Sequence, residues 1–152
     1  MFRNLFLSSL FLFAFSCSET SINKANDAYL KETINYQSKN IYGFENLFDG
    51  RITSQVDQNV FGVLHFPNNY DASRQYPLVI ASHGSSNWRD HHRRYLEQMR
   101  QADYLVFAIH PFDSRDVSST VGNQINVTSE TVIYEMAQAL NLMSTDSRVD
   151  NQ

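Results

Sequence analysis

A strand-like apolar run that breaks into a turn of small residues is the feature of this sequence with the clearest chemical meaning. Leu78–Ala81 is apolar throughout, Ser82-His83-Gly84 follows it, and a Ser-Ser-Asn turn comes next. A buried strand that ends in such a turn can present backbone N–H groups to an oxygen atom of a substrate. The turn around His83 and Gly84 is therefore the first candidate for a functional site.

The sequence does not supply the nucleophile that such a turn would serve. A nucleophile on a sharp strand-to-helix turn needs small flanking residues, in the pattern G-x-S-x-G or G-x-C-x-G. The five glycines stand at positions 43, 50, 62, 84 and 122, and no two of them are four apart. The glycine-rich patterns that bind dinucleotides or phosphates are absent as well, so the sequence predicts no cofactor.

The five histidines do not predict a metal site. His83, His91 and His92 lie near one another in sequence, but their spacing matches no recurrent zinc pattern. Adjacent residues on a helix point about 100° apart, which makes it hard for His91 and His92 to chelate one ion. His65 and His110 are interpreted as residues at strand ends that are hydrogen-bonded locally.

Length and charge narrow the class of protein. The chain has 152 residues, enough for one domain, and a net charge of −4. Nucleic-acid binding, which favours a clustered basic face, is therefore not predicted. The only local basic cluster, Arg89 with Arg93 and Arg94, is interpreted as the solvated face of a helix.

Residues 1–17 are predicted to be a signal peptide. Leu5–Phe15 is a largely apolar run of 11 residues after a short positive start, too short for the ~20 residues of a membrane-spanning helix. The small residue before Cys17 resembles the bacterial lipobox, although Ala14 and Phe15 depart from that pattern. We expect an exported protein, attached to the membrane of the cell envelope by a lipid on Cys17. An ordinary signal peptide and a secreted product are the alternative.

The next part of the chain is predicted to hold an arm and two early strands. Residues 18–42 read as a polar linker or N-terminal arm, with a short helix at Ala25–Ile34, and residues 43–152 read as the folded domain. From Arg51 onward, apolar and polar residues alternate up to Val56, and Val60–Phe66 is a second strand-like run. These two segments predict an antiparallel pair.

The remaining elements alternate between strands and helices. The pattern predicts strands at 78–82 and 104–109, and helices at 90–101 and 129–143 with Ser129 as N-cap. A polar loop occupies 113–128. Continuous apolar strands suit a parallel sheet that is covered on both faces. The order of elements predicts an open α/β fold with a mostly parallel sheet.

From about Val60 to Asp150 the chain resembles the first half of a dienelactone hydrolase-like α/β-hydrolase. The resemblance rests on "YPLVIASHGSSNWRDHHRRYLEQMRQADYLVFAIHPFDSR", then "VSSTVGNQINVT", then the helix that ends in "STDSRVD". In that family a strand ending in His-Gly forms the oxyanion loop. The strand after the Arg-Val/Ile-Asp turn carries the nucleophile. The resemblance implies that residues 43–152 are the N-terminal part of such a domain.

The resemblance assigns few residues of this chain to a site. It implies that the backbone N–H of Ser85 is one oxyanion donor and that His83 and Gly84 shape its turn. The nucleophile, the acid and the catalytic histidine are expected beyond Gln152, so no catalytic residue is assigned here. A loop cluster could line the substrate cleft or could consist of ordinary loop residues: Asp113, Ser114 and Arg115.

Two functions follow as expectations. The first is the N-terminal part of an exported hydrolase of small esters or lactones that works through an acyl-enzyme. The second is a non-catalytic surface lipoprotein or binding module on a degenerate hydrolase scaffold. A sheet that ends after its fourth strand would leave an unpaired apolar edge at Tyr104–Ile109 or beside it, which disfavours the second.

Overall fold

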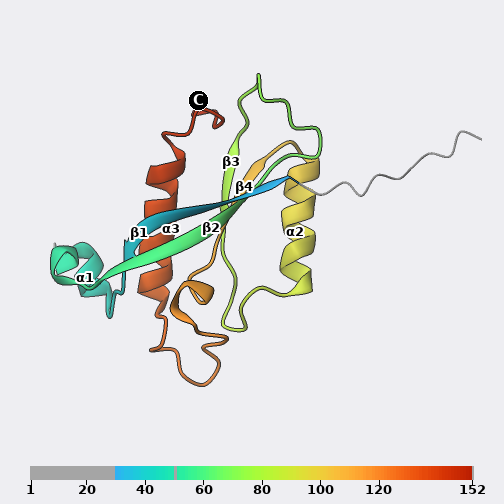
Figure 1. Cartoon of the computed structure of the whole chain (residues 1–152). Helices are drawn as coiled ribbons and strands as arrows, with labels where there is room; N and C mark the ends of the chain where they lie inside the picture. The colour runs from blue at the N-terminus through green and yellow to red at the C-terminus, as the bar shows by residue number, and fades with distance from the viewer. Residues whose placement is uncertain (1–29, 50, 152) are drawn as a thin grey trace, which may run out of the picture.

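The fold is a four-stranded mixed sheet between two helices (Figure 1). A computed structural model describes residues 30–49 and 51–151. The predicted signal peptide, Cys17 and the first part of the predicted arm lie outside the described residues. In the described part, no helix is long and apolar enough to cross a membrane.

The strands are β1 (Lys31–Lys39), β2 (Asp57–His65), β3 (Leu78–Ala81) and β4 (Leu105–Ile109), in the order β1-β2-β4-β3. β1 pairs antiparallel with β2, and β2 pairs antiparallel with β4. β3 and β4 are parallel, with Ile80 opposite Phe107. The α/β class is confirmed, but the sheet is mixed rather than mostly parallel in the part that the structure describes.

The central strand β4 separates two apolar cores. Leu105, Phe107 and Ile109 face the longer helix α3 (Ser129–Met143), while Val106 and Ala108 face α2 (Asp90–Gln101). All five residues of β4 are buried. This two-sided burial explains why the strand is apolar without alternation.

Both long helices have the predicted bounds, and one cap differs. Thr128, and not Ser129, is the N-cap of α3, because its side chain accepts a hydrogen bond from the backbone N–H of Thr131 at 3.1 Å. Three shorter helical segments complete the described chain: α1 (Phe44–Phe48) and the 3-10 turns η1 (Arg51–Ser54) and η2 (Asp113–Arg115).

Two expectations for the early segments are wrong. Lys31–Lys39 is an edge strand of the sheet and not a linker or helix, because Tyr36 and Ser38 alternate with exposed neighbours and pack inward. Arg51–Ser54 is a 3-10 turn and not a strand. The Ser54 hydroxyl donates to the carbonyl of Arg51 at 2.7 Å, a local bond that competes with strand pairing. The antiparallel pair therefore consists of β1 and β2.

One glycine of the sheet is required by a close approach. A Cβ atom at Gly62 in β2 would lie 2.3 Å from Cζ of Phe107, which is fully buried. The Phe107 ring thus fills the space beside the Gly62 backbone, and any side chain there would displace it.

The end of the described chain returns to the open side of β3. The N–H of Tyr76 donates to the carbonyl of Arg148, and the N–H of Asp150 donates to the carbonyl of Tyr76, both at 2.9 Å. These bonds form a parallel bridge between Tyr76 and Val149. The segment around Val149 therefore runs alongside the start of β3, in the same direction.

Candidate functional site

The turn after β3 is held in one shape by hydrogen bonds to the carbonyl of Gly84. The N–H of Asn87 donates to this oxygen at 3.0 Å, and Nδ1 of His83 lies 2.8 Å from it. Asn87 has φ of 64°, a left-handed conformation that asparagine adopts more readily than most residues. The Gly84 carbonyl shares a rigid peptide unit with the N–H of Ser85. Fixing the carbonyl therefore fixes the direction of that N–H.

The Ser85 N–H is free of hydrogen-bond partners among the described residues, whereas the Ser85 carbonyl has two. This carbonyl accepts from the N–H of Thr120 and from the hydroxyl of Ser119, both at 2.9 Å. The turn is thereby tied to the loop that follows η2. An oriented N–H without an internal partner is what binding of an oxyanion requires.

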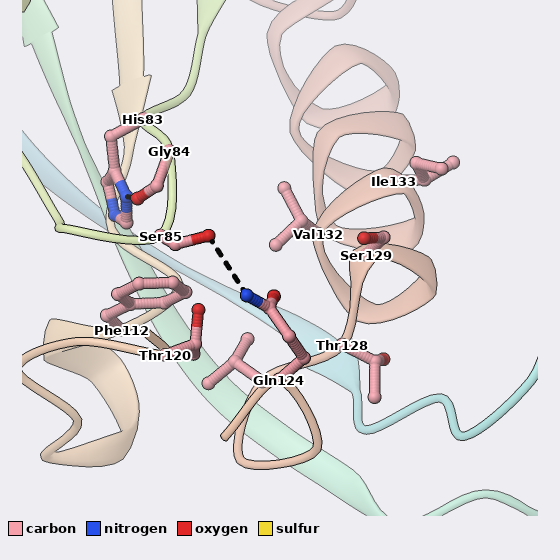
Figure 2. Close-up of a pocket in the computed structure, with 11 residues that line it drawn as sticks. His83, Gly84, Ser85, Phe112, Thr120, Gln124, Thr128, Ser129, Val132 and Ile133 are labelled. Atoms are coloured by element: carbon pink, nitrogen blue, oxygen red, sulfur yellow. Dashed lines mark hydrogen bonds between the residues drawn. The ribbon is translucent and has the colours of Figure 1, made fainter. Parts of the chain in front are cut away.

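A cavity of about 240 Å³ lies beside this turn (Figure 2). Its walls come from the turn after β3, the short segment between β4 and η2, the loop before α3 and the first two turns of α3: His83, Gly84, Ser85, Phe112, Thr120, Gln124, Val127, Thr128, Ser129, Val132 and Ile133. The Gln124 side chain points toward Ser85, and its Nε2 donates to the Ser85 hydroxyl at 3.3 Å. The structure thus brings the three predicted oxyanion-turn residues together in one cavity.

His83 is a neutral member of this wall. Its ring packs edge-on against Phe112, at 4.5 Å between ring centroids, and against Trp88 at 5.4 Å. Burial lowers the pKa of His83, although the hydrogen bond to Gly84 and the charge of Asp113 act in the opposite direction. Because a carbonyl accepts, Nδ1 carries the proton and Nε2 does not. Nε2 is buried and has no hydrogen-bond partner among the described residues.

Asp113 lies outside the Ser85 cavity and joins two turns. Its Oδ1 accepts from the Asn87 amide at 2.7 Å, and its Oδ2 lies 2.6 Å from Nδ1 of His110. Burial raises the pKa of Asp113, but the hydrogen bonds from His110 and Asn87 outweigh it and hold the pKa below its usual value. Asp113 lines a separate cavity of about 390 Å³, together with Trp88, Arg93 and His110 among others.

Ser114 and Arg115 do not line the Ser85 cavity. The Ser114 hydroxyl accepts from the N–H of Phe61 at 3.1 Å. The Arg115 guanidinium donates to the Pro111 carbonyl at 2.7 Å and to Glu135 Oε2 at 2.8 Å, and its side chain is 7% exposed. Both side chains hold the segment after β4 in place.

Among the described residues, no histidine other than His83 lines the Ser85 cavity. Among residues 30–49 and 51–151, no three metal-ligating side chains are close enough to hold an ion. His110 is hydrogen-bonded locally, to Asp113. The rings of His91 and His92 do not diverge, because their centroids are 3.8 Å apart. Nδ1 of His92 accepts from the N–H of Arg89 and is thereby engaged at the start of α2.

Several residues of the site were not predicted. Thr120 and Gln124 reach the cavity from the polar loop at 113–128, which carries no periodic signal, and Phe112 reaches it from directly before that loop. Asn87 could have been found, because an Asn at the end of a short turn is typical of a left-handed position.

Comparison with known proteins gives weak likenesses only. No family model and no curated protein matches the chain. A solved structure titled m3DLH is 16% identical with a TM-score of 0.47, and the match covers 80% of this chain and 46% of that one. A putative dienelactone hydrolase from Klebsiella pneumoniae is 12% identical with a TM-score of 0.44, over 78% of this chain and 46% of that one.

A third structure, the hypothetical protein PA2218 from Pseudomonas aeruginosa, is 15% identical with a TM-score of 0.41, and the match covers 79% of this chain and 32% of that one. The chain therefore spans less than half the length of each of these structures. Likeness at this level identifies neither a family nor an activity.

Proposed function

We propose that this chain is the N-terminal part of an exported α/β-hydrolase that cleaves small esters or lactones by acyl transfer. In this proposal the chain supplies one of two oxyanion donors, the backbone N–H of Ser85. The observation that carries the proposal is this N–H, which is oriented by the Gly84 carbonyl and has no hydrogen-bond partner among the described residues.

The open side of β3 supports a nucleophile that follows Asp150 in sequence. The bridge between Tyr76 and Val149 sets the chain beside β3 and parallel to it. A strand that continues in this direction would end at the same edge of the sheet as the Ser85 turn, because parallel strands share their carboxyl ends. Ile133 and Leu140 of α3 are 49% and 53% exposed, an apolar surface that further chain could cover.

The chemistry divides between the two parts of the protein. A serine hydroxyl or cysteine thiol beyond Gln152 attacks the substrate carbonyl carbon, and a histidine takes its proton. The carbonyl oxygen becomes an oxyanion that accepts from the Ser85 N–H and from the N–H after the nucleophile. The tetrahedral intermediate collapses, the alcohol leaves with the proton, and water then hydrolyses the acyl-enzyme to the acid.

The place of the protein in the cell is part of the same proposal. The apolar run Leu5–Phe15 and Cys17 support export, with a lipid on Cys17 as the membrane attachment.

The proposal is tested by reading the coding sequence past Gln152 and assaying two products on a generic activated ester. The 152-residue chain is expected to show no turnover above background. A longer product that carries G-x-S-x-G or G-x-C-x-G is expected to hydrolyse the ester. Turnover by the 152-residue chain itself, or a stop codon directly after Gln152, would contradict the proposal.

A further inference from the structure

Four polar side chains of β1, η2 and α3 are buried. Tyr36 and Ser38 are 8% and 3% exposed, and the side chains of Arg115 and Glu135 are 7% and 0% exposed. Tyr36 and Ser38 are two residues apart on β1 and therefore lie on the same face of that strand. Arg115 and Glu135 form an ion pair at 2.8 Å from η2 and α3.

The surroundings place Tyr36, Arg115 and Glu135 in one region, and Ser38 lies on the Tyr36 face of β1. Tyr36 belongs to the same core cluster as Ala139 and Met143, which lie on α3 after Glu135. Arg115 Nε donates to the Asn40 side chain at 2.7 Å, at the end of β1. Burial and the charge of Glu135 raise the pKa of Tyr36, so the hydroxyl keeps its proton.

Each of the four side chains retains a polar atom without a hydrogen-bond partner in the described part of the chain. These atoms are Tyr36 Oη, Ser38 Oγ, Arg115 Nη2 and Glu135 Oε1. An unpaired buried polar group lowers the ratio of folded to unfolded protein by roughly 5-fold to 100-fold. Four such groups in one region would make the folded state hard to maintain, so a further hydrogen-bonding partner is required.

We propose that Tyr36, Ser38, Arg115 and Glu135 enclose an internal hydration site in which bound water completes their hydrogen bonds. The site needs a ligand that both donates and accepts, because Glu135 Oε1 can only accept and Arg115 Nη2 can only donate. The charges of Arg115 and Glu135 balance, which favours an uncharged ligand. An anion would meet the Glu135 carboxylate, and a cation would meet the Arg115 guanidinium. Water has the required properties.

This site goes beyond the proposed function and does not depend on it. Arg115 also donates to the carbonyl of Pro111, the residue before Phe112 in the wall of the Ser85 cavity. Through this hydrogen bond to the backbone, the hydrated cluster holds the neighbouring residue Phe112 in its position in the cavity wall.

Tyr36→Phe tests the site in the full chain, because it removes one hydroxyl and leaves the ring in place. If water bridges Tyr36 Oη, its loss should raise the unfolding equilibrium constant about fivefold or more, measured by urea denaturation. The control is Tyr42→Phe, since Tyr42 is 54% exposed, and no change is expected there. If Tyr36→Phe leaves the constant unchanged or lowers it, the hydroxyl has no partner and the proposal fails.

A high-resolution crystal structure of the full chain tests the same site without relying on a variant that folds. The expected result is a water peak within hydrogen-bonding distance of both Glu135 Oε1 and Arg115 Nη2. Direct hydrogen bonds among the four side chains with no such peak would overturn the proposal, and so would an ion at this place.

Discussion

The side-chain amide of Asn87 donates to Oδ1 of Asp113 at 2.7 Å and so joins the turn after β3 to the turn after β4. The same carboxylate holds His110 through its other oxygen. A second tie runs from the Ser85 carbonyl to Ser119 and Thr120. Hydrogen bonds from two loops therefore hold the Ser85 turn in place, and they set the direction of its free N–H.

Replacement of Asn87 should separate the conformational and hydrogen-bonding parts of this brace. Asn87→Ala loses the amide and must hold φ of 64° without the tolerance of asparagine. We expect a loss of about 2–4 kcal/mol in the free energy of unfolding by urea denaturation. Asn87→Gly keeps the conformation and should lose about 1–2 kcal/mol. Equal losses in the two variants would contradict a left-handed requirement.

Stability should fall in weakly acidic solution because of His65. Burial, followed by the charge of Arg100, lowers the pKa of His65 from 6.5 to about 4. The folded pKa is below the unfolded one, so the unfolded chain binds the proton first as the pH falls. Full stability is present above pH 6.5 and is lost progressively down to about pH 4, by on the order of 3 kcal/mol at most.

The neutral variant His65→Gln measures this contribution. Its urea midpoint should change less between pH 7 and pH 4.5 than that of the natural chain. His83 and His92 also have lowered pKa values and remain in the variant, so some dependence should persist. If the urea midpoint of His65→Gln changes with pH as much as that of the natural chain, His65 does not cause the loss of stability in acid.

The ion pair of Arg115 and Glu135 should be costly to break on one side only. Glu135→Leu leaves the Arg115 charge buried without its partner, and we expect a loss of about 3–5 kcal/mol in the free energy of unfolding. Replacing both residues, as Arg115→Met with Glu135→Leu, should recover much of this loss in a double-mutant cycle. If the double variant loses the sum of the two single losses, the pair is not coupled.

The sequence predicts the parts of this fold in which local pattern and burial agree. β4, α2 and α3 are the strand and helices that the sequence predicts. Their apolar residues recur at the spacing of a strand or a helix, and they face the two apolar cores. β1 was missed because its buried face carries Tyr36 and Ser38, polar groups that hide the alternation. Arg51–Ser54 was mistaken for a strand because a local hydrogen bond of Ser54 outweighs its weak alternation.

The site was predictable only where sequence neighbours build it. His83, Gly84 and Ser85 are contiguous, so one turn signal located all three. The role of Arg115 was not predictable, because its partners Asn40 and Glu135 are 75 and 20 residues away in sequence and no local pattern reveals them. Gln124 and Phe112 enter the cavity through the same kind of long-range packing.

The most direct test of the account compares Ser85→Pro with Ser85→Ala in the longer product that carries the nucleophile. Ser85 follows Gly84 at the second position of a turn closed by Asn87, a position that suits proline. Proline removes the N–H, whereas alanine keeps it. We predict that Ser85→Pro lowers kcat roughly 100-fold to 1,000-fold with its fold intact by circular dichroism, and that Ser85→Ala stays within about threefold of the natural protein. An active Ser85→Pro variant would contradict the central claim that the Ser85 N–H binds the oxyanion.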